Sequence, residues 1–244
     1  MAGNILLCYN ITNKGILEVE KMYNKYFQVE RQEKMRSSFL EIGKRGNMRK
    51  YPKNSLIQIK GEDAICIVMS GNLKQSIYSL EGEEKILYLL RSGEIFKEMD
   101  YFAGGEAKLE TTALKDSTIS VLDKRVVEEI LLENPSIYRD IIHSITRKFR
   151  IVMFQMLNMA FSDSIGKVAD TLVRLYYQEG EEMVQGKKIN DRFTHEKIAK
   201  LIGCSRVTVT RVLNRFKDEN IINIMNGEIV IKDIENLEKY IRWK

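Results

Sequence analysis

The most informative stretch of the chain, residues 194–217, reads THEKIAKLIGCSRVTVTRVLNRFK. It predicts two short helices joined by a tight turn. Thr194 suits the N-cap of the first helix, and Gly203 can take the positive φ that a sharp turn needs. Ser205 suits the N-cap of the second helix, whose apolar positions recur at helical spacing. A short helix, a glycine turn and a basic second helix indicate a helix-turn-helix, which presents its second helix to the major groove of DNA.

The charge around this stretch separates it from an ordinary helical hairpin with a solvated basic face. Residues 187–217 hold nine lysines and arginines against two acidic residues. The basic residues are Lys187, Lys188, Arg192, Lys197, Lys200, Arg206, Arg211, Arg215 and Lys217, and the acidic ones are Asp191 and Glu196. Because the balance is so lopsided, it favours a nucleic-acid-binding surface over the ordinary hairpin.

A β-hairpin is predicted directly after the second helix, around Asn226-Gly227. Two runs rich in β-branched residues flank this pair, with Ile221, Ile222 and Ile224 before it and Ile229, Val230 and Ile231 after it. Asn-Gly is a strong hairpin signal, because a type I′ turn needs positive φ at both central residues. A hairpin in this place is a wing, so residues 165–232 are expected to form a winged helix-turn-helix.

Eight residues of this segment are candidate DNA contacts: Ser205, Arg206, Val207, Thr208, Thr210, Arg211, Arg215 and Lys217. Arg206 and Arg211 lie in the first turn and a half of the second helix, where each bidentate contact from arginine to guanine is worth about 1–3 kcal/mol. Val207 can make only apolar contacts, for example with a thymine methyl. The hydroxyls and Lys217 are expected to hold phosphates. For Ser205, helix capping alone is an equal alternative.

Residues 49–122 change to a pattern of short strands. Gly61, Gly71, Gly82 and Gly93 recur at intervals of 10, 11 and 11 residues, with alternating or apolar runs between them. Short strands with turn glycines every 8–12 residues indicate a β-sandwich or barrel. Ordinary loops also contain glycines, but the regular spacing favours the barrel. Upstream, the helical composition of residues 16–42 predicts one or two helices.

A long helix is predicted over residues 136–160, after a short helix at 124–133 that ends before Pro135. Apolar residues recur along the long helix at spacings of 4, 3, 4, 3, 4 and 3; they are Tyr138, Ile142, Ile145, Phe149, Val152, Met156 and Met159. This is the a/d seam of a coiled coil. Such a seam can pair with a second copy of the chain or pack against the chain's own barrel. A further helix at 165–178 is followed by Gly180, which suits a C′ residue.

Residues 202–213, Ile-Gly-Cys-Ser-Arg-x-Thr-Val-x-Arg-Val-Leu, resemble the helix-turn-helix signature of the Crp/Fnr family of bacterial transcription regulators. The similarity extends over nearly the whole chain from about residue 50. It implies an α+β protein with an N-terminal β jelly-roll of cyclic-nucleotide-binding type, a long dimerisation helix and a C-terminal winged helix-turn-helix. The expected parts are a helical extension (1–48), the barrel effector domain (49–135), the dimerisation helix (136–162) and the DNA-binding domain (163–244). Residues 51–57 resemble the opening strand of the jelly-roll.

The resemblance also implies partners. It makes Ile142, Ile145, Phe149, Val152, Met156 and Met159 the interface of a homodimer, since the family dimerises through the matching helix. Double-stranded DNA with a pseudo-palindromic site is the expected partner, RNA polymerase is a further candidate, and a small-molecule effector of unknown identity is a third. The rival interpretation is a small-molecule-binding barrel protein whose helical tail contacts proteins rather than DNA. The basic helix and the wing argue against this rival.

Cyclic-nucleotide binders of this family hold the phosphate with a Gly-Glu-Leu turn followed by Arg-Ser or Arg-Thr, and the glutamate takes the ribose hydroxyl. The matching positions here are Lys97, Glu98 and residues 108–113. The glutamate is retained, but lysine replaces the glycine and residues 108–113 contain no arginine. The resemblance therefore makes Lys97, Glu98 and Lys108 the candidate effector-pocket residues and predicts that cyclic AMP does not bind.

Composition narrows the remaining possibilities. The chain of 244 residues can hold two modest domains, and its net charge of +5 permits nucleic-acid binding. Its three cysteines are scattered without a metal-ligand or disulfide pattern, which is typical of a cytoplasmic protein. No apolar run approaches the roughly 20 residues of a membrane span, and no signal peptide is expected.

Catalytic, metal and haem sites are not expected either. An iron–sulfur cluster generally needs four cysteines, and a haem needs an axial ligand. The two histidines, His143 and His195, are expected to be surface or packing residues. No nucleophile–base pair or carboxylate dyad has a recognisable spacing. We therefore expect a protein that is not an enzyme and that carries no cofactor.

Overall fold

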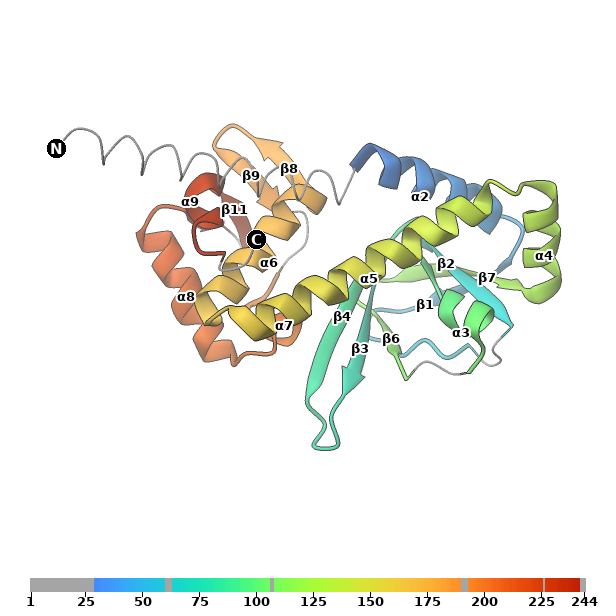
Figure 1. The fold of residues 1–244 in the computed structure, drawn as a ribbon, viewed down its shortest axis with the longest axis horizontal. Helices are drawn as coiled ribbons and strands as arrows, with labels where there is room; N and C mark the ends of the chain where they lie inside the picture. Colours follow the sequence, from blue (N-terminus) through green and yellow to red (C-terminus); the bar gives the residue numbers. More distant parts are fainter. Residues whose placement is uncertain (1–28, 60–62, 106–107, 190–192, 226, 242–244) are drawn as a thin grey trace. The chain divides into compact units, whose positions relative to one another are not determined.

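A computed structural model describes residues 29–59, 63–105, 108–189, 193–225 and 227–241 (Figure 1). The chain divides into two compact units. One unit is Glu30–Val152, and the described residues from Met153 onward belong to the other. The expected helices before residue 29 and Gly61 lie outside the described residues.

The first unit is a β-sandwich with helices at both ends of its sequence. Its elements are α2 (Val29–Gly43), β1 (Asn47–Tyr51), β2 (Ala64–Ser70), β3 (Asn72–Tyr78), β4 (Glu84–Arg91), β5 (Ile95–Phe96), α3 (Glu98–Ala103), β6 (Glu110–Ala113), β7 (Ser117–Asp123), α4 (Lys124–Glu133) and the larger part of α5 (Ile137–Phe161). One sheet has the strand order β1-β7-β2-β5 and the other β4-β3-β6. All pairings within them are antiparallel, and β3 and β4 form a long hairpin (Figure 1).

The expected β jelly-roll is confirmed, and its turns use the predicted glycines. Gly71, Gly82 and Gly93 have φ values of 88°, 83° and 80°, which glycine adopts without steric cost. The opening strand, however, lies earlier than predicted. Strand β1 ends at Tyr51, because Pro52 has no amide hydrogen for a ladder. Of residues 52–57, Leu56 forms only an isolated bridge with Thr112.

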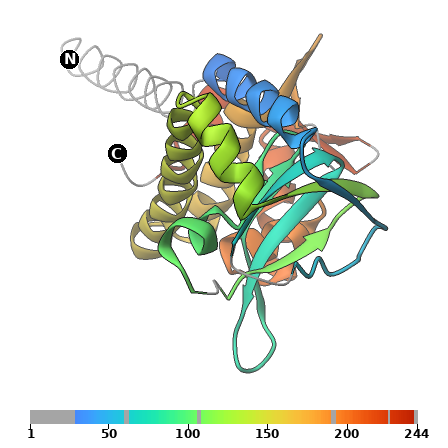
Figure 2. The ribbon, with the colours of Figure 1, turned by 90° about the vertical axis from the view of Figure 1, so that its right-hand side faces the viewer.

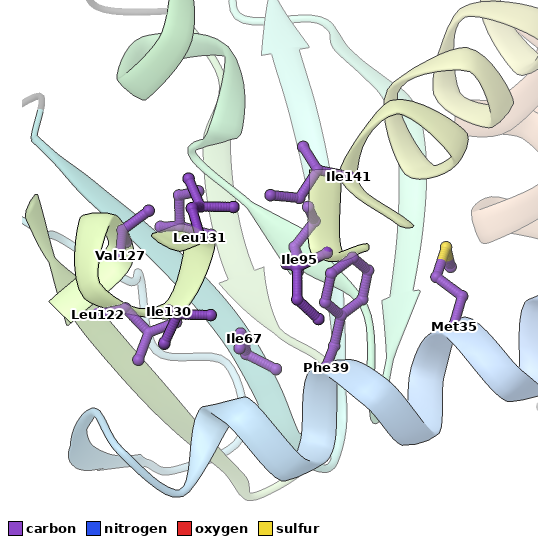
Figure 3. Packing of buried hydrophobic residues seen from close by; sticks show 11 residues of the cluster. Met35, Phe39, Ile67, Ile95, Leu122, Val127, Ile130, Leu131 and Ile141 are labelled. Atoms are coloured by element: carbon purple, nitrogen blue, oxygen red, sulfur yellow. The ribbon is translucent and has the colours of Figure 1, made fainter. Parts of the chain in front are cut away.

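Helices α2, α4 and α5 close one end of the sandwich over a shared apolar core. Figure 3 shows Phe39 of α2 beside Ile95 and Ile141, with Ile67 between α2 and α4. The buried members of the cluster are Met35, Phe39, Ile65, Ile67, Ile95, Leu122, Val127, Ile130, Leu131, Ile137 and Ile141. In Figure 2, α2 (blue) and α4 (yellow-green) lie next to each other. Burying each large apolar side chain is worth about 1.5–3 kcal/mol, so this core fixes α2 and the first turns of α5 to the barrel.

The second unit contains the predicted winged helix-turn-helix. After α5 come α6 (Ser164–Glu179), β8 (Gly180–Met183), β9 (Gly186–Ile189), α7 (His195–Ile202), α8 (Arg206–Asp218), β10 (Ile222–Met225), β11 (Glu228–Ile231) and α9 (Ile234–Glu238). Strands β10 and β11 pair antiparallel as the predicted hairpin, and Gly227 has a φ of 79°. Asn226, the other predicted turn residue, lies outside the described residues.

The β8–β9 hairpin was not predicted. It extends the wing into a sheet with the order β10-β11-β9-β8. Helix α6 ends one residue before Gly180, but the expected left-handed C′ conformation is wrong, because Gly180 has a φ of −72° and begins β8. Glycine at this position instead lets the chain pass close to the backbone of Tyr176. A Cβ at this position would lie 2.5 Å from the carbonyl oxygen of Tyr176.

Candidate nucleic-acid interface and barrel pocket

The turn between α7 and α8 is fixed by two helix N-caps and one glycine, each at the residue that the sequence predicted. Thr194 Oγ1 accepts a hydrogen bond from the amide of Lys197 at 3.1 Å. Gly203 adopts the left-handed conformation with a φ of 68° and ends α7. Ser205 Oγ accepts from the amide of Thr208 at 3.1 Å and begins α8. The start and end of α7 and the start of α8 are therefore fixed, which sets the direction of α8.

The apolar faces of both helices are buried. Their buried residues are Ile198, Ala199, Leu201, Ile202, Val209, Val212, Leu213 and Phe216. Burial of one face leaves the opposite face of α8 open. An open hollow along that face is lined by Arg206, Val207, Thr210, Arg211, Asn214, Arg215, Asp218 and Glu219.

The N-terminal half of α8 carries the cations available to an outside partner. Arg206, Val207 and Arg211 are exposed. Neither arginine forms an ion pair with any residue in the part of the chain that the structure describes. Two exposed guanidinium groups one and a half turns apart form a donor surface that suits phosphates and guanine edges.

The C-terminal half of α8 differs, because one of its two cations, Arg215, is engaged within the chain. Arg215 Nε lies 2.8 Å from Glu219 Oε1, and Tyr240 donates to the other Glu219 oxygen at 2.5 Å. The hydrogen bond to Glu219 raises the pKa of Arg215, and the same bond lowers the pKa of Glu219. Since Asp218 adds a further carboxylate, the surface around Arg215 is less positive than the surface around Arg206 and Arg211. Lys217 nearby is exposed.

The three hydroxyls that the sequence proposed as phosphate contacts make hydrogen bonds within the chain. Ser205 Oγ lies 2.9 Å from Thr208 Oγ1 in addition to capping α8. Thr210 Oγ1 donates to the carbonyl of Arg206 at 2.9 Å and lies 2.8 Å from His195 Nδ1. Which of the two atoms donates in the Thr210–His195 hydrogen bond depends on the tautomer of His195. This contact ties the start of α7 to α8, a role that sequence spacing did not reveal.

A cavity of about 370 Å³ lies in the barrel unit, at the start of α3. Lys97 and Glu98 line it as the resemblance implied, but exposed Lys108 does not. Lys97 has a left-handed backbone with a φ of 66°, a conformation that favours glycine. Its ammonium lies 2.9 Å from Asp100 Oδ2.

The second lysine of the cavity lining comes from α5. Lys148 is buried, and its Nζ lies 2.6 Å from Glu98 Oε1 and 2.8 Å from the carbonyl oxygen of Ile95. The side chain that would take a ribose hydroxyl is therefore paired with a lysine of the long helix. No pattern in the sequence indicated that Lys148 lies beside Glu98.

The heptad seam of α5 is largely exposed in the single chain. Ile142, Phe149 and Met156 are 60%, 68% and 64% exposed. Tyr138 and Met159 are also exposed, whereas Ile145 and Val152 are half-buried. The α5 residues that pack into the barrel core are Ile137 and Ile141, with Ile145 at its margin. Packing of the whole seam against the chain's own barrel is therefore wrong.

The chain resembles known proteins over both units. The family described as cyclic nucleotide-binding domain matches residues 48–134, and the family described as Crp-like helix-turn-helix domain matches residues 166–240. Among solved structures, a mutant of CooA from Carboxydothermus hydrogenoformans aligns with a TM-score of 0.72 at 24% identity, over 82% of this chain and 89% of that one. FixK2 from Bradyrhizobium japonicum aligns with a TM-score of 0.70 at 15% identity, over 82% and 98%. These two structures support the fold.

Curated relatives extend the resemblance to sequence. The cAMP-activated global transcriptional regulator CRP of Haemophilus influenzae is 29% identical over 188 residues, which are 76% of this chain and 84% of the relative. The CRP-like cAMP-activated global transcriptional regulator of Mycobacterium tuberculosis is 24% identical over 194 residues, or 79% and 87%. Within the described ranges, no helix has the length and apolarity to cross a membrane. With the barrel, the helix-turn-helix and these relatives in the same order along one chain, the protein belongs to the Crp/Fnr family of transcription regulators.

Proposed function

We propose that the chain acts in the cytoplasm as a homodimer that binds a pseudo-palindromic DNA site through two copies of α8. The observation that carries this proposal is the exposed pair Arg206 and Arg211 on a helix whose opposite face is buried and whose N-terminus is capped. Because the two-fold axis of a dimer would repeat this surface, each copy would read one half-site. RNA polymerase is a further proposed partner, and we propose no enzymatic activity.

The proposed dimer forms through the seam of α5. The exposed seam residues are large and apolar, and a contiguous apolar surface of this kind commonly marks an interaction site. The a/d spacing suits a parallel pair of helices, since each side chain then meets its symmetry mate. The homodimers that the family forms through the matching helix support the same assignment.

Within α8, we assign base reading to Arg206 and Arg211, with Val207 beside them, and phosphate contact to Lys217. Ser205, Thr208 and Thr210 have hydrogen-bond partners within the chain, so their contribution to phosphate binding is expected to be smaller. Arg215 is expected to shape the interface through Glu219 and Tyr240 rather than to contact bases.

An Arg211→Ala substitution tests the base-reading role. On a DNA site selected by the unmodified chain, we expect the affinity to fall by about 1–3 kcal/mol, since a bidentate contact is lost. On a scrambled site the loss should be smaller, because only a positive charge has been removed. Equal losses on the two sites would make Arg211 a phosphate contact.

Lys217→Ala is the matched control for a phosphate contact. It should weaken binding to both sites alike and flatten the slope of log affinity against log salt concentration by about one unit. Gel-shift titrations at several salt concentrations measure both effects. An unchanged slope would remove Lys217 from the interface.

Cyclic AMP is not expected to be the effector. Both lysines of the cavity are already engaged by carboxylates, and residues 108–113 offer no arginine to a phosphate. Calorimetric titration of the full chain with cyclic AMP and cyclic GMP should give no heat of binding at micromolar concentrations. Micromolar binding of either nucleotide would contradict the role assigned to Glu98 and Lys148.

A further inference from the structure

Each cation that lines the barrel cavity is paired with a carboxylate of the chain, and one further carboxylate, Glu110, is exposed to solvent. Among the described lining residues, the cations are Lys97 and Lys148, and the carboxylates are Glu98, Asp100 and Glu110. Lys97 pairs with Asp100 at 2.9 Å, and Lys148 pairs with Glu98 at 2.6 Å. Each lysine therefore already has a carboxylate partner. An anionic ligand would have to compete with these carboxylates for every cation of the described lining.

A cationic ligand is disfavoured for a different reason. The carboxylate that is most deeply buried in the lining, Glu98, already has the ammonium of Lys148 at 2.6 Å. The same ammonium donates to the carbonyl of Ile95, which holds it in place. A second cation at Glu98 would meet a fixed like charge in a region of low dielectric constant, where the repulsion is strong.

One acceptor of the lining is left over. Glu98 is 1% exposed, and its Oε2 has no hydrogen-bond partner in the part of the chain that the structure describes. A buried acceptor without a donor is costly, so the site favours a ligand that brings an O–H or N–H group. Apolar side chains form much of the surrounding wall, among them Ile57, Phe96 and Leu109.

We propose that this cavity binds an uncharged small molecule with an apolar body and one hydroxyl or amide group, which donates a hydrogen bond to Glu98 Oε2. The proposal rests on the regulator function proposed above, with the barrel as the effector domain that the family resemblance implies. Lys148 then acts as a built-in counter-ion of the site. Because Lys148 lies on α5, a ligand at Glu98 would act directly on the contact between the barrel and the proposed dimer helix.

Four probes with the same two-ring body test this ligand class. Naphthylmethanol and naphthamide are uncharged donors, naphthoate is an anion and naphthylmethylammonium is a cation. Methyl NMR titrations of the full chain, followed at Ile57 and Leu109, measure binding in the cavity itself. We expect each uncharged probe to bind at least about tenfold more tightly than either charged probe, as a hydrogen bond to a buried carboxylate implies.

A paired replacement locates the effect at Glu98. Glu98→Leu together with Lys148→Met exchanges a buried ion pair for apolar side chains, a change that proteins often tolerate. In this variant the two uncharged probes should bind about tenfold more weakly than in the unmodified chain. Lys108→Ala, which changes an exposed lysine outside the cavity, should leave all four affinities unchanged.

Three outcomes would overturn the proposal: naphthoate or the ammonium probe binding as tightly as the uncharged probes, no methyl shift with either uncharged probe at millimolar concentration, or unaltered affinities in a folded paired variant. If the paired variant does not fold, the affinities of the four probes for the unmodified chain still test the proposed ligand class. DNA binding is measured on the same protein without probes, so a failure of the proposed function is seen separately.

Discussion

A Phe149→Glu chain is expected to be a folded monomer that binds a DNA site with two half-sites about 10²–10⁴-fold more weakly than the unmodified chain. Phe149 lies in the middle of the seam and is 68% exposed in the single chain, so the substitution leaves the barrel core intact. In the proposed dimer the two glutamates would face each other without water, and such unpaired charges are strongly destabilising. Each monomer would then hold one half-site alone.

Sedimentation velocity and circular dichroism measure the two parts of this prediction. Leu132→Glu is the matched control, because Leu132 is an apolar residue on α4 that is 80% exposed and lies outside the seam. That variant should remain dimeric and keep its DNA affinity. A dimeric Phe149→Glu protein with intact DNA binding would place the interface elsewhere on the chain.

Replacing Glu94 with glutamine is expected to lower the free energy of unfolding of the barrel by about 3–5 kcal/mol. Glu94 is buried between Arg36 of α2, at 2.9 Å, and Arg147 of α5, at 3.0 Å. Without its negative charge, Glu94 would no longer supply the counter-charge that lies between these two guanidinium groups. Urea denaturation followed by circular dichroism at neutral pH measures the loss.

Glu129→Gln is the control for this prediction, because Glu129 lies on the surface beside Arg45 and Arg125. Exposed pairs of this kind are worth about 0–1 kcal/mol. A loss at Glu94 no larger than the loss at Glu129 would show that the buried cluster does not hold α2 and α5 to the barrel.

The pKa of Glu94 also predicts how the free energy of unfolding of the barrel depends on pH. Burial raises the pKa of Glu94, but Arg147 and Arg36 lower it by more, and the pKa falls to about 2 from an ordinary value of 4.5. Since the folded pKa lies below the unfolded one, the contribution of Glu94 is complete above the unfolded value and is lost as the pH falls toward 2. The Glu94→Gln chain should therefore lose less stability than the unmodified chain in this interval.

The helix-turn-helix was predictable because its determinants are local. Thr194, Gly203 and Ser205 act on backbone groups within a few residues, and the apolar spacing gives the buried faces directly. The β8–β9 hairpin was not predictable from the sequence. Its strands lack the alternation of apolar and polar residues that indicates a strand, and they carry charged residues at Glu181, Glu182, Lys187 and Lys188. It is held by pairing with β11, which lies more than forty residues away from β9.

The candidate pocket was predictable only in part, for a similar reason. The resemblance located Lys97 and Glu98, but the lysine that pairs with Glu98 is fifty residues further along the chain. No spacing rule connects these two positions before the fold is known. Arg215 shows the same limit, since its contacts with Glu219 and Tyr240 could not be predicted from the spacing of the helix.

The central claim is that two copies of α8 read one DNA site with two-fold symmetry. Its most direct test is selection of fragments from the genomic DNA of the source organism by the full chain, with and without cell extract, followed by sequencing. We predict a shared motif of two inverted half-sites whose centres lie about 10–10.5 base pairs, or a multiple of this, apart. Recovered fragments that share no inverted motif under either condition would contradict the account.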